Sequence, residues 1–250
     1  KRYARGGLYP ETAWEFADRL SDQEALETIA PAGSVALSAS VNYLLWAGIG
    51  SKAGFLHFHC GCLGSGHGHA DQLHIDLVYK GETILADSGR YTYVDGPLRR
   101  ALKSPAGHNV VRVNDLDFSV CSNSWGYSAL AEPLKGEYKF TPAADYASGA
   151  HLGYMNQGVL PRRRVLRLGG GLWVVCDSFD TTADADRLYQ QYLHFGPTGS
   201  VALEGGQAVF QGQSSSAALA FPGQGRQWAL YKAPLSRAYN RLAEGDCLRG

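Results

Sequence analysis

The fold of this chain is decided by the stretch Gly64-Ser-Gly-His67-Gly-His69-Ala-Asp71-Gln-Leu-His74-Ile-Asp76-Leu77. It combines closely spaced histidines and aspartates with glycines and with alternating apolar residues. Two later segments continue the pattern, Asp87-Ser-Gly89-Arg90-Tyr91-Thr-Tyr93 and Gly107-His108-Asn109-Val-Val111. This mixture is expected of a metal or proton-transfer site that is mounted on β-strands.

The composition favours β-structure. The 250 residues include 31 glycines and 14 tyrosines but a single methionine, which suits strands joined by tight turns better than a helical bundle. Lys and Arg together number 23, as do Asp and Glu, so the net charge points to neither nucleic acid nor a membrane as a partner, and we expect neither. The longest apolar runs are well short of a membrane span.

Apolar alternation with a period of two predicts many short strands from residue 35 onward. We therefore predict an all-β domain over residues 35–250, built as an antiparallel β-sandwich. Residues 1–34 contain the one helix-like stretch and are interpreted as a short helical N-terminal linker. Residues 95–105 are expected to form a loop, and no final strand is expected at the C-terminus. The expected strands are 35–46, 53–60, 73–79, 83–86, 108–113, 136–140, 163–168, 172–177, 188–195, 200–203, 208–211, 217–221 and 228–231.

Three segments bring candidate metal ligands together. If residues 67–77 are extended, His67, His69 and Asp71 share one face. Asp87 ends the return strand of the next hairpin and can approach His69, while His108 comes from a third segment. Nitrogen and oxygen ligands suit zinc, and also iron or manganese. The other histidines are interpreted as hydrogen-bonded structural residues, namely His57, His59, His74, His151 and His194.

Short patterns in this region leave other functions open. Gly61, then five residues and His67-x-His69, is the opening of a cupin-type motif, which would make the chain a metal oxidoreductase or isomerase. The cupin pattern also requires a glutamate four or five positions later, which this sequence lacks. His69-x-Asp71 with the distant His108 is compatible with an iron facial triad. A non-catalytic carbohydrate-binding sandwich is a further alternative.

The three segments together resemble the C-terminal domain of heparinase II/III-like polysaccharide lyases. The family pattern runs H-G-H-x-D, then D-P/S-G-x-Y-x-Y, then A-H-N-x-V, and the matching residues are 67–71, 87–93 and 107–111. A weaker resemblance continues through 162–167, 172–177 and 193–197. The resemblance implies a β-sandwich that follows a helical toroid domain, and residues 1–34 would then be the tail of that domain.

The resemblance also implies roles for individual residues. A divalent metal, expected to be Zn²⁺, would be held by His69, Asp87 and His108. His67 would be the catalytic histidine that faces the substrate. Two further residues would support the ligands from behind, Asp71 and Asn109. Four basic residues would bind the anionic substrate, namely Arg90, Arg99, Arg100 and Arg164.

The implied reaction is β-elimination at a uronic acid of an anionic polysaccharide. A base removes the C5 proton and an acid protonates the departing O4, and His67 suits the role of base. In relatives the helical toroid supplies the catalytic tyrosine and the residue that neutralises the uronate carboxylate. We therefore expect this chain to be weakly active or inactive by itself, and to need a toroid domain in the same protein or in a partner chain. A periplasmic or secreted location is expected from the substrate class alone.

Overall fold

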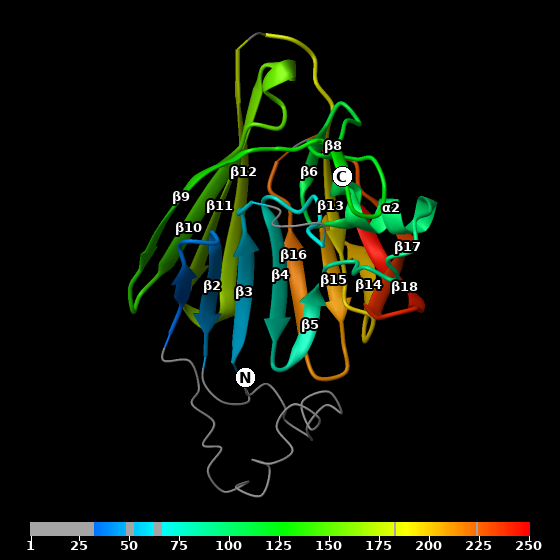
Figure 1. Ribbon diagram of the computed structural model, residues 1–250. Helices are drawn as coiled ribbons and strands as arrows, with labels where there is room; N and C mark the ends of the chain where they lie inside the picture. The colour runs from blue at the N-terminus through cyan, green and yellow to red at the C-terminus, as the bar shows by residue number, and fades with distance from the viewer. Residues whose placement is uncertain (1–32, 49–52, 63–66, 183, 224) are drawn as a thin grey trace, which may run out of the picture. The chain divides into compact units, whose positions relative to one another are not determined.

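A computed structural model of the chain describes residues 33–48, 53–62, 67–182, 184–223 and 225–250. The linker expected over residues 1–34 lies almost entirely outside the described residues and stays a prediction. The described part consists mainly of antiparallel strands with one short α-helix (Figure 1). The predicted all-β, antiparallel fold class is therefore confirmed. Within these residues, no helix is long and apolar enough to cross a membrane.

A five-stranded antiparallel sheet carries the central histidine stretch. Its strands lie in chain order, β1-β2-β3-β4-β5. The prediction of a single strand over residues 35–46 is wrong. A turn in which Val41 has a φ of 49° divides this segment into two strands. The bounds are Val35–Leu37 for β1, Asn42–Ala47 for β2, Gly54–His59 for β3, His74–Tyr79 for β4 and Glu82–Leu85 for β5.

The other strands form two four-stranded sheets, a three-stranded sheet and a small hairpin. The first sheet has the order β12-β11-β10-β9, with bounds Leu172–Thr181, Val159–Leu168, Asp145–His151 and Pro133–Phe140. The second has the order β17-β18-β13-β6, with bounds Ala229–Ala238, Arg241–Arg249, Tyr189–His194 and Val111–Val113. The third contains β14 (Ser200–Glu204), β15 (Gln207–Gln211) and β16 (Ser216–Ala220). The hairpin pairs β7 (Val120–Cys121) with β8 (Tyr127–Ala129).

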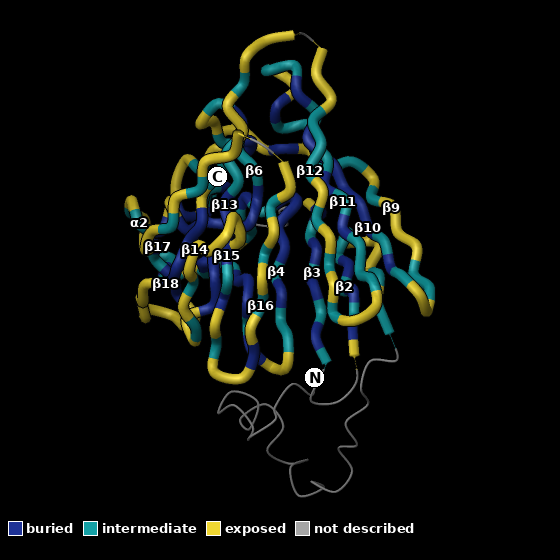
Figure 2. The backbone as a smooth tube through the Cα atoms, turned by 180° about the vertical axis from the view of Figure 1, so that it is seen from behind, coloured by how far each residue is buried: buried dark blue, intermediate teal, exposed yellow. Residues whose placement is uncertain are grey.

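The core lies between the five-stranded sheet and the other sheets. Buried positions alternate in β2 and β3, where Tyr43 and Leu45 lie across from Phe58 and Leu56. They join one core cluster with Val165 of β11 and with residues of β13, β15 and β18. Figure 2 shows buried positions concentrated along the strands and exposed ones at the connecting loops. Full burial of each large apolar side chain contributes about 1.5–3 kcal/mol, which makes this face the main source of stability.

The opposite face of the same sheet is polar where β3 ends and β4 begins, although Trp46 and Phe55 stack on it further along. Because side chains alternate along a strand, the residues that carry imidazoles and a carboxylate lie away from the apolar core. In the register of β3 and β4, His57 pairs with Asp76 and His59 pairs with His74. This polar face leads directly to the candidate site.

Helix α2 (Pro97–Lys103) occupies the segment that was expected to be a loop. Pro97 lies in its first turn, where a missing backbone N–H costs nothing, and the short helix turns Arg99 and Lys103 inward. The described residues also include three single-turn 3₁₀ helices, η4 (Pro105–Gly107), η5 (Met155–Gln157) and η6 (Gly169–Gly171).

Two further expectations about strands are wrong. The chain ends in a long hairpin of β17 and β18, although no final strand was expected. Strand β10 was not predicted, because its residues are mostly small and show no alternation of large apolar side chains. Small residues are needed there because the strand is closely packed. A Cβ at Gly149, for example, would collide with the sulfur of Cys60 in the neighbouring sheet.

Candidate metal centre and substrate cleft

An open cleft of about 600 Å³ collects residues of the first two motif segments. His67, His69 and Asp71 reach it from the turn before β4, and Asp87 and Arg90 reach it from the segment after β5. Residues 236–239 at the end of the β17–β18 hairpin also line it, directly beside the second motif segment, because Gly89 and Ser236 form a parallel β-bridge. Sequence reasoning did not associate this hairpin with the site.

Gly89 makes the close approach of this hairpin possible. It has a φ of 82°, which favours glycine, and a Cβ at this position would collide with the carbonyl oxygen of Ser236. The backbone N–H of Ser236 donates to the Ser88 carbonyl oxygen at 2.8 Å. The Gly89 N–H donates to Asp87 Oδ1 at 2.6 Å and so fixes that carboxylate.

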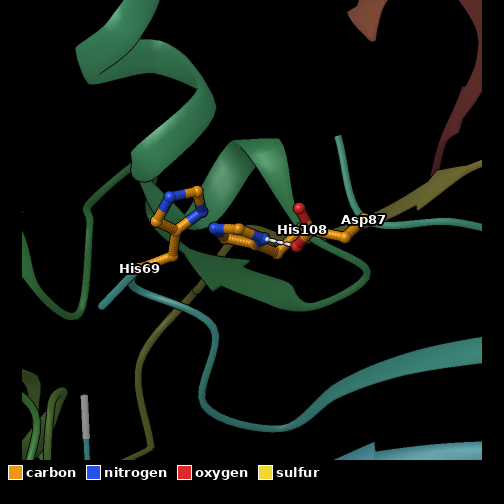
Figure 3. Close-up of side chains that lie close together, drawn as sticks. All are labelled: His69, Asp87 and His108. Carbon is orange, nitrogen blue, oxygen red and sulfur yellow. Dashed lines mark hydrogen bonds and ion pairs between the residues drawn. The ribbon is translucent and has the colours of Figure 1, made fainter. Parts of the chain in front are cut away.

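His69, Asp87 and His108 lie together, as the sequence predicted (Figure 3). Each offers one ligand atom, and these atoms lie within 4.8 Å of one another. His108 Nδ1 lies 2.7 Å from Asp87 Oδ2, and the two imidazole ring centres are 5.4 Å apart. Three segments that are distant in sequence therefore form one possible metal site.

The protonation states of these groups suit metal binding. Burial by itself would raise the pKa of Asp87, but the charge and hydrogen bond of His108 outweigh it and hold that pKa well below its usual range. Burial, assisted by His108 and Arg99, lowers the pKa of His69 to about 3. Near neutral pH the site thus offers a carboxylate and a neutral imidazole. His108 Nε2 is buried and has no hydrogen-bond partner among the described residues, which is a further sign that the group fits a metal.

Arg99 competes with a metal for His69. The buried guanidinium donates through Nη1 to His69 Nε2 at 2.8 Å. A neutral imidazole has one ring nitrogen with a free lone pair, so it cannot accept this hydrogen bond and bind a metal at the same time. Metal binding through His69 therefore requires the release of Arg99.

Asn109 ties the metal-site segments together, in keeping with its predicted supporting role. Its Nδ2 donates to the carbonyl oxygens of Ile75 and Ala86, at 2.7 and 3.1 Å. Its Oδ1 accepts from the His194 backbone N–H at 2.6 Å. The side chain is fully buried and links β4, the residue before Asp87 and β13. It thereby holds the backbone on both sides of the metal site.

Asp76 was missed by the sequence reasoning, although it belongs to the same network. It lies 3.1 Å from His74 Nε2 and 3.2 Å from His57 Nδ1, and it accepts the Asp87 backbone N–H at 3.0 Å. His74 Nδ1 accepts the Asn109 backbone N–H, so the proton of a neutral His74 ring lies on Nε2, facing Asp76. The missed signal was the alternation in β3 and β4, which places these polar residues on one face.

His67 is exposed at the cleft and does not belong to the metal cluster. Its ring meets Tyr93 and Trp125 edge to face, with ring centres 4.9 and 5.2 Å away. Residues 67–73 are not extended, so the expected shared face of His67, His69 and Asp71 is wrong. Asp71 instead faces His59, with 3.6 Å between its Oδ1 and His59 Nε2.

The four predicted arginines occupy different environments. Arg90 lines the cleft, whereas Arg99 is buried behind His69. Arg100 is exposed and paired with Asp95. Arg164 donates to Ser178 within the sheet of β9–β12 and is not among the residues that line the cleft.

Arg163, next to Arg164, is the arginine with the clearest structural role. It is fully buried, pairs with both oxygens of Asp177 at 2.7 and 2.8 Å, and donates to the carbonyl oxygens of Asn109 and Leu73. The alternation of β11 turns Arg163 inward. It supports the segments that carry the site.

Fold and site together define a β-sandwich with a histidine–aspartate cluster, a possible metal site, at the edge of an open cleft. A family model described as "Heparinase II/III-like, C-terminal" matches residues 31–245. The chain therefore belongs to the heparinase II/III-like family, as its C-terminal domain. No curated protein sequence matches the chain.

Solved structures of lyases share this fold. Heparan sulfate lyase HepC from Pedobacter heparinus superposes with a TM-score of 0.73 at 14% identity, over 88% of this chain and 34% of that chain. The heparinase III-BT4657 gene product gives 0.72 at 16%, over 94% and 36%. A structure of heparinase III gives 0.61 at 14%, over 83% and 32%. The chain thus spans about a third of the length of these lyases, and the likeness concerns the fold.

Proposed function

We propose that this chain is the β-sandwich domain of a polysaccharide lyase that cleaves a uronic-acid-containing glycan by β-elimination. The observation that carries the proposal is the position of His67 in a chain of a lyase family: it is exposed in the cleft that His69 and Asp87 also line. The printed name of one structural relative, heparan sulfate lyase, supports an anionic glycan as the substrate class.

The elimination requires a base, an acid and a group that neutralises the uronate carboxylate. The base removes the C5 proton, the electron pair of that C–H bond forms the C4–C5 double bond, and the C4–O4 bond breaks. The acid delivers a proton to the departing O4. Neutralising the carboxylate makes the C5 proton more acidic by stabilising the negative charge that develops.

His67 is the proposed base. Its imidazole is exposed to the cleft, and imidazole is the side chain that exchanges a proton most readily near neutral pH. The edge contacts with Tyr93 and Trp125 limit the orientations of the ring. A helical toroid domain is proposed to supply the acid and the carboxylate-neutralising group, so the isolated chain would be weakly active or inactive.

His69, Asp87 and His108 are proposed to hold Zn²⁺, an ion that suits two imidazoles and a carboxylate. When bound, the ion would supply structural cross-linking of three chain segments rather than polarisation of the substrate. The turn between His67 and His69 is then held in place next to the cleft. A periplasmic or secreted location remains our proposal, because it follows from a polysaccharide substrate.

The test separates the base from the metal site. In a polypeptide where this chain follows a helical toroid domain, His67→Gln is expected to abolish formation of the unsaturated uronate while leaving about one equivalent of zinc bound. His69→Gln is expected to lose the zinc. Unsaturated product at an undiminished rate in the His67 variant would refute the assignment of the base. Freely exchanging iron or manganese in the wild type would favour a cupin-like enzyme instead.

A further inference from the structure

The hairpin of β17 and β18 contributes side chains to the cleft that no motif of the sequence singled out. Arg237 and Tyr239 both line the cleft and are both exposed. Tyr239 is 47% exposed although large aromatic residues are usually covered, and its ring centre lies 6.0 Å from that of Tyr93 in the neighbouring segment. The hairpin thus presents a cation and an aromatic face side by side.

A second unassigned aromatic residue comes from the turn between β7 and β8. Trp125 stacks on Tyr93, with ring centres 5.1 Å apart and an angle of 18° between the planes, yet it remains 48% exposed. The guanidinium of Arg90 lies over two rings, at 4.8 Å from Tyr93 and 5.5 Å from Tyr239. Tyr93 and Arg90 line the cleft, and Trp125 extends their surface beyond the lining residues through its ring contacts with Tyr93 and His67.

The backbone holds both turns in place. The Asn240 N–H donates to the Tyr91 carbonyl oxygen at 2.7 Å, which fixes the tip of the β17–β18 hairpin against the second motif segment. Asn123 Oδ1 accepts the backbone N–H groups of Trp125 and Gly126, each at 2.8 Å. A wall that is already ordered loses little conformational entropy when a ligand binds.

The charges of the cleft leave two guanidiniums available. Among the residues that the structure describes, neither Arg90 nor Arg237 lies in an ion pair. The two carboxylates that line the cleft have other partners, since Asp87 faces His108 and Asp71 faces His59. An anionic ligand would therefore find two guanidiniums here that are not in an ion pair with any described carboxylate.

We propose that Trp125, Tyr93 and Tyr239, with Arg90 and Arg237, form a subsite for one acidic sugar residue beside the residue on which His67 acts. The proposal rests on the function proposed above and adds the residues that select the substrate. The aromatic faces bind the C–H face of the sugar ring, and the two guanidiniums pair with its carboxylate or sulfate group.

The experiment measures the binding of two hexasaccharides by calorimetry. Both have the same uronic-acid-containing backbone; one is a heparan sulfate hexasaccharide and the other is its unsulfated counterpart. Trp125→Ala and Arg237→Gln are each expected to weaken binding about tenfold. Arg237→Gln is also expected to reduce the dependence of binding on salt, because it removes one charge contact. Tyr138→Ala and Arg249→Gln are the matched controls, since both residues are exposed and neither lines the cleft.

The outcomes separate the subsite from the lyase function. Binding of both glycans that depends on Arg237 identifies the carboxylate as the recognised group, and binding of the sulfated glycan alone identifies sulfate. Affinities that are unchanged in the Trp125 and Arg237 variants, or no binding by the wild type, would overturn the subsite even if the lyase reaction occurs. Binding that requires both residues, without any cleavage in the protein that includes the toroid, would support the subsite and contradict the lyase function.

Discussion

Replacing Asn109 with alanine should damage both the fold and the metal site. The side chain is fully buried and makes three hydrogen bonds to backbone groups, those of Ile75, Ala86 and His194. Each backbone group left unpaired in the interior costs about 1–3 kcal/mol, so with three such groups we expect a loss of at least about 3 kcal/mol in the free energy of unfolding. Ala86 precedes Asp87 and Asn109 follows His108, so the metal ligands should shift as well.

Urea unfolding at a fixed zinc concentration measures the first effect, and metal analysis after dialysis measures the second. Asn156→Ala is a suitable control, because Asn156 is an exposed asparagine in the 3₁₀ helix η5. The control should lose less than about 1 kcal/mol and keep its metal. An Asn109 variant that is as stable as this control, with unchanged metal content, would show that Asn109 does not hold these segments together.

Three other substitutions test separate features of the site. Gly89→Ala should disrupt the contact with Ser236, so we expect a loss of about 2–4 kcal/mol in urea unfolding and weaker glycan binding, because a Cβ there meets the Ser236 carbonyl oxygen. Arg99→Met should tighten zinc binding about tenfold in competition with a chelator, because it removes a hydrogen bond and a positive charge that oppose the metal. His151→Asn should reduce the loss of stability in acid. Burial lowers the pKa of His151 from its ordinary value of 6.5 to about 3. Below pH 6.5 the unfolded chain binds a proton at His151 that the folded protein does not bind. The free energy of unfolding that is present above pH 6.5 is therefore lost as the pH falls below that value. The wild type should therefore lose stability relative to the variant by about 1.4 kcal/mol per pH unit in urea unfolding.

Each of these expectations has a result that contradicts it. A stable Gly89→Ala protein with unaltered glycan affinity would mean that the hairpin can move away without consequence. The control Arg100→Gln changes an exposed arginine next to Arg99 and should leave zinc affinity unaltered. Weaker zinc binding by Arg99→Met would contradict the competition between Arg99 and the metal for His69. Parallel pH curves for the wild type and His151→Asn would show that the buried ring is not a source of acid sensitivity.

The order of residues along the chain was sufficient to predict the fold class and the metal cluster. Alternating apolar residues in β2, β3 and β4 specify strands with one buried face, because the side-chain period of a strand is two. Three short segments with histidine and aspartate, in the order of a known family, placed His69, Asp87 and His108 together. Local sequence carries this information because each ligand lies at the end of a strand or in a turn that its own neighbours define.

The same local reasoning failed where distant segments determine the structure. Strand β10 has small residues because another sheet packs closely against it, and helix α2 depends on the inward packing of Arg99 and Lys103. Neither requirement is visible in the segment itself. Asp76 was overlooked although His74 lies two residues before it on β4, and only its second partner, His57, is brought to it by the pairing of β3 with β4.

The sequence by itself determined that this chain is an antiparallel sandwich of the heparinase II/III-like family with a histidine–aspartate cluster. Only the tertiary structure decided what surrounds that cluster. It placed Arg99 against His69, Asn109 between three segments and the β17–β18 hairpin beside Arg90 at the cleft. The physical reason is that strand pairing and ligand motifs are encoded over a few residues, whereas a cleft is formed by segments far apart in the chain, whose approach depends on packing and on single positions such as Gly89.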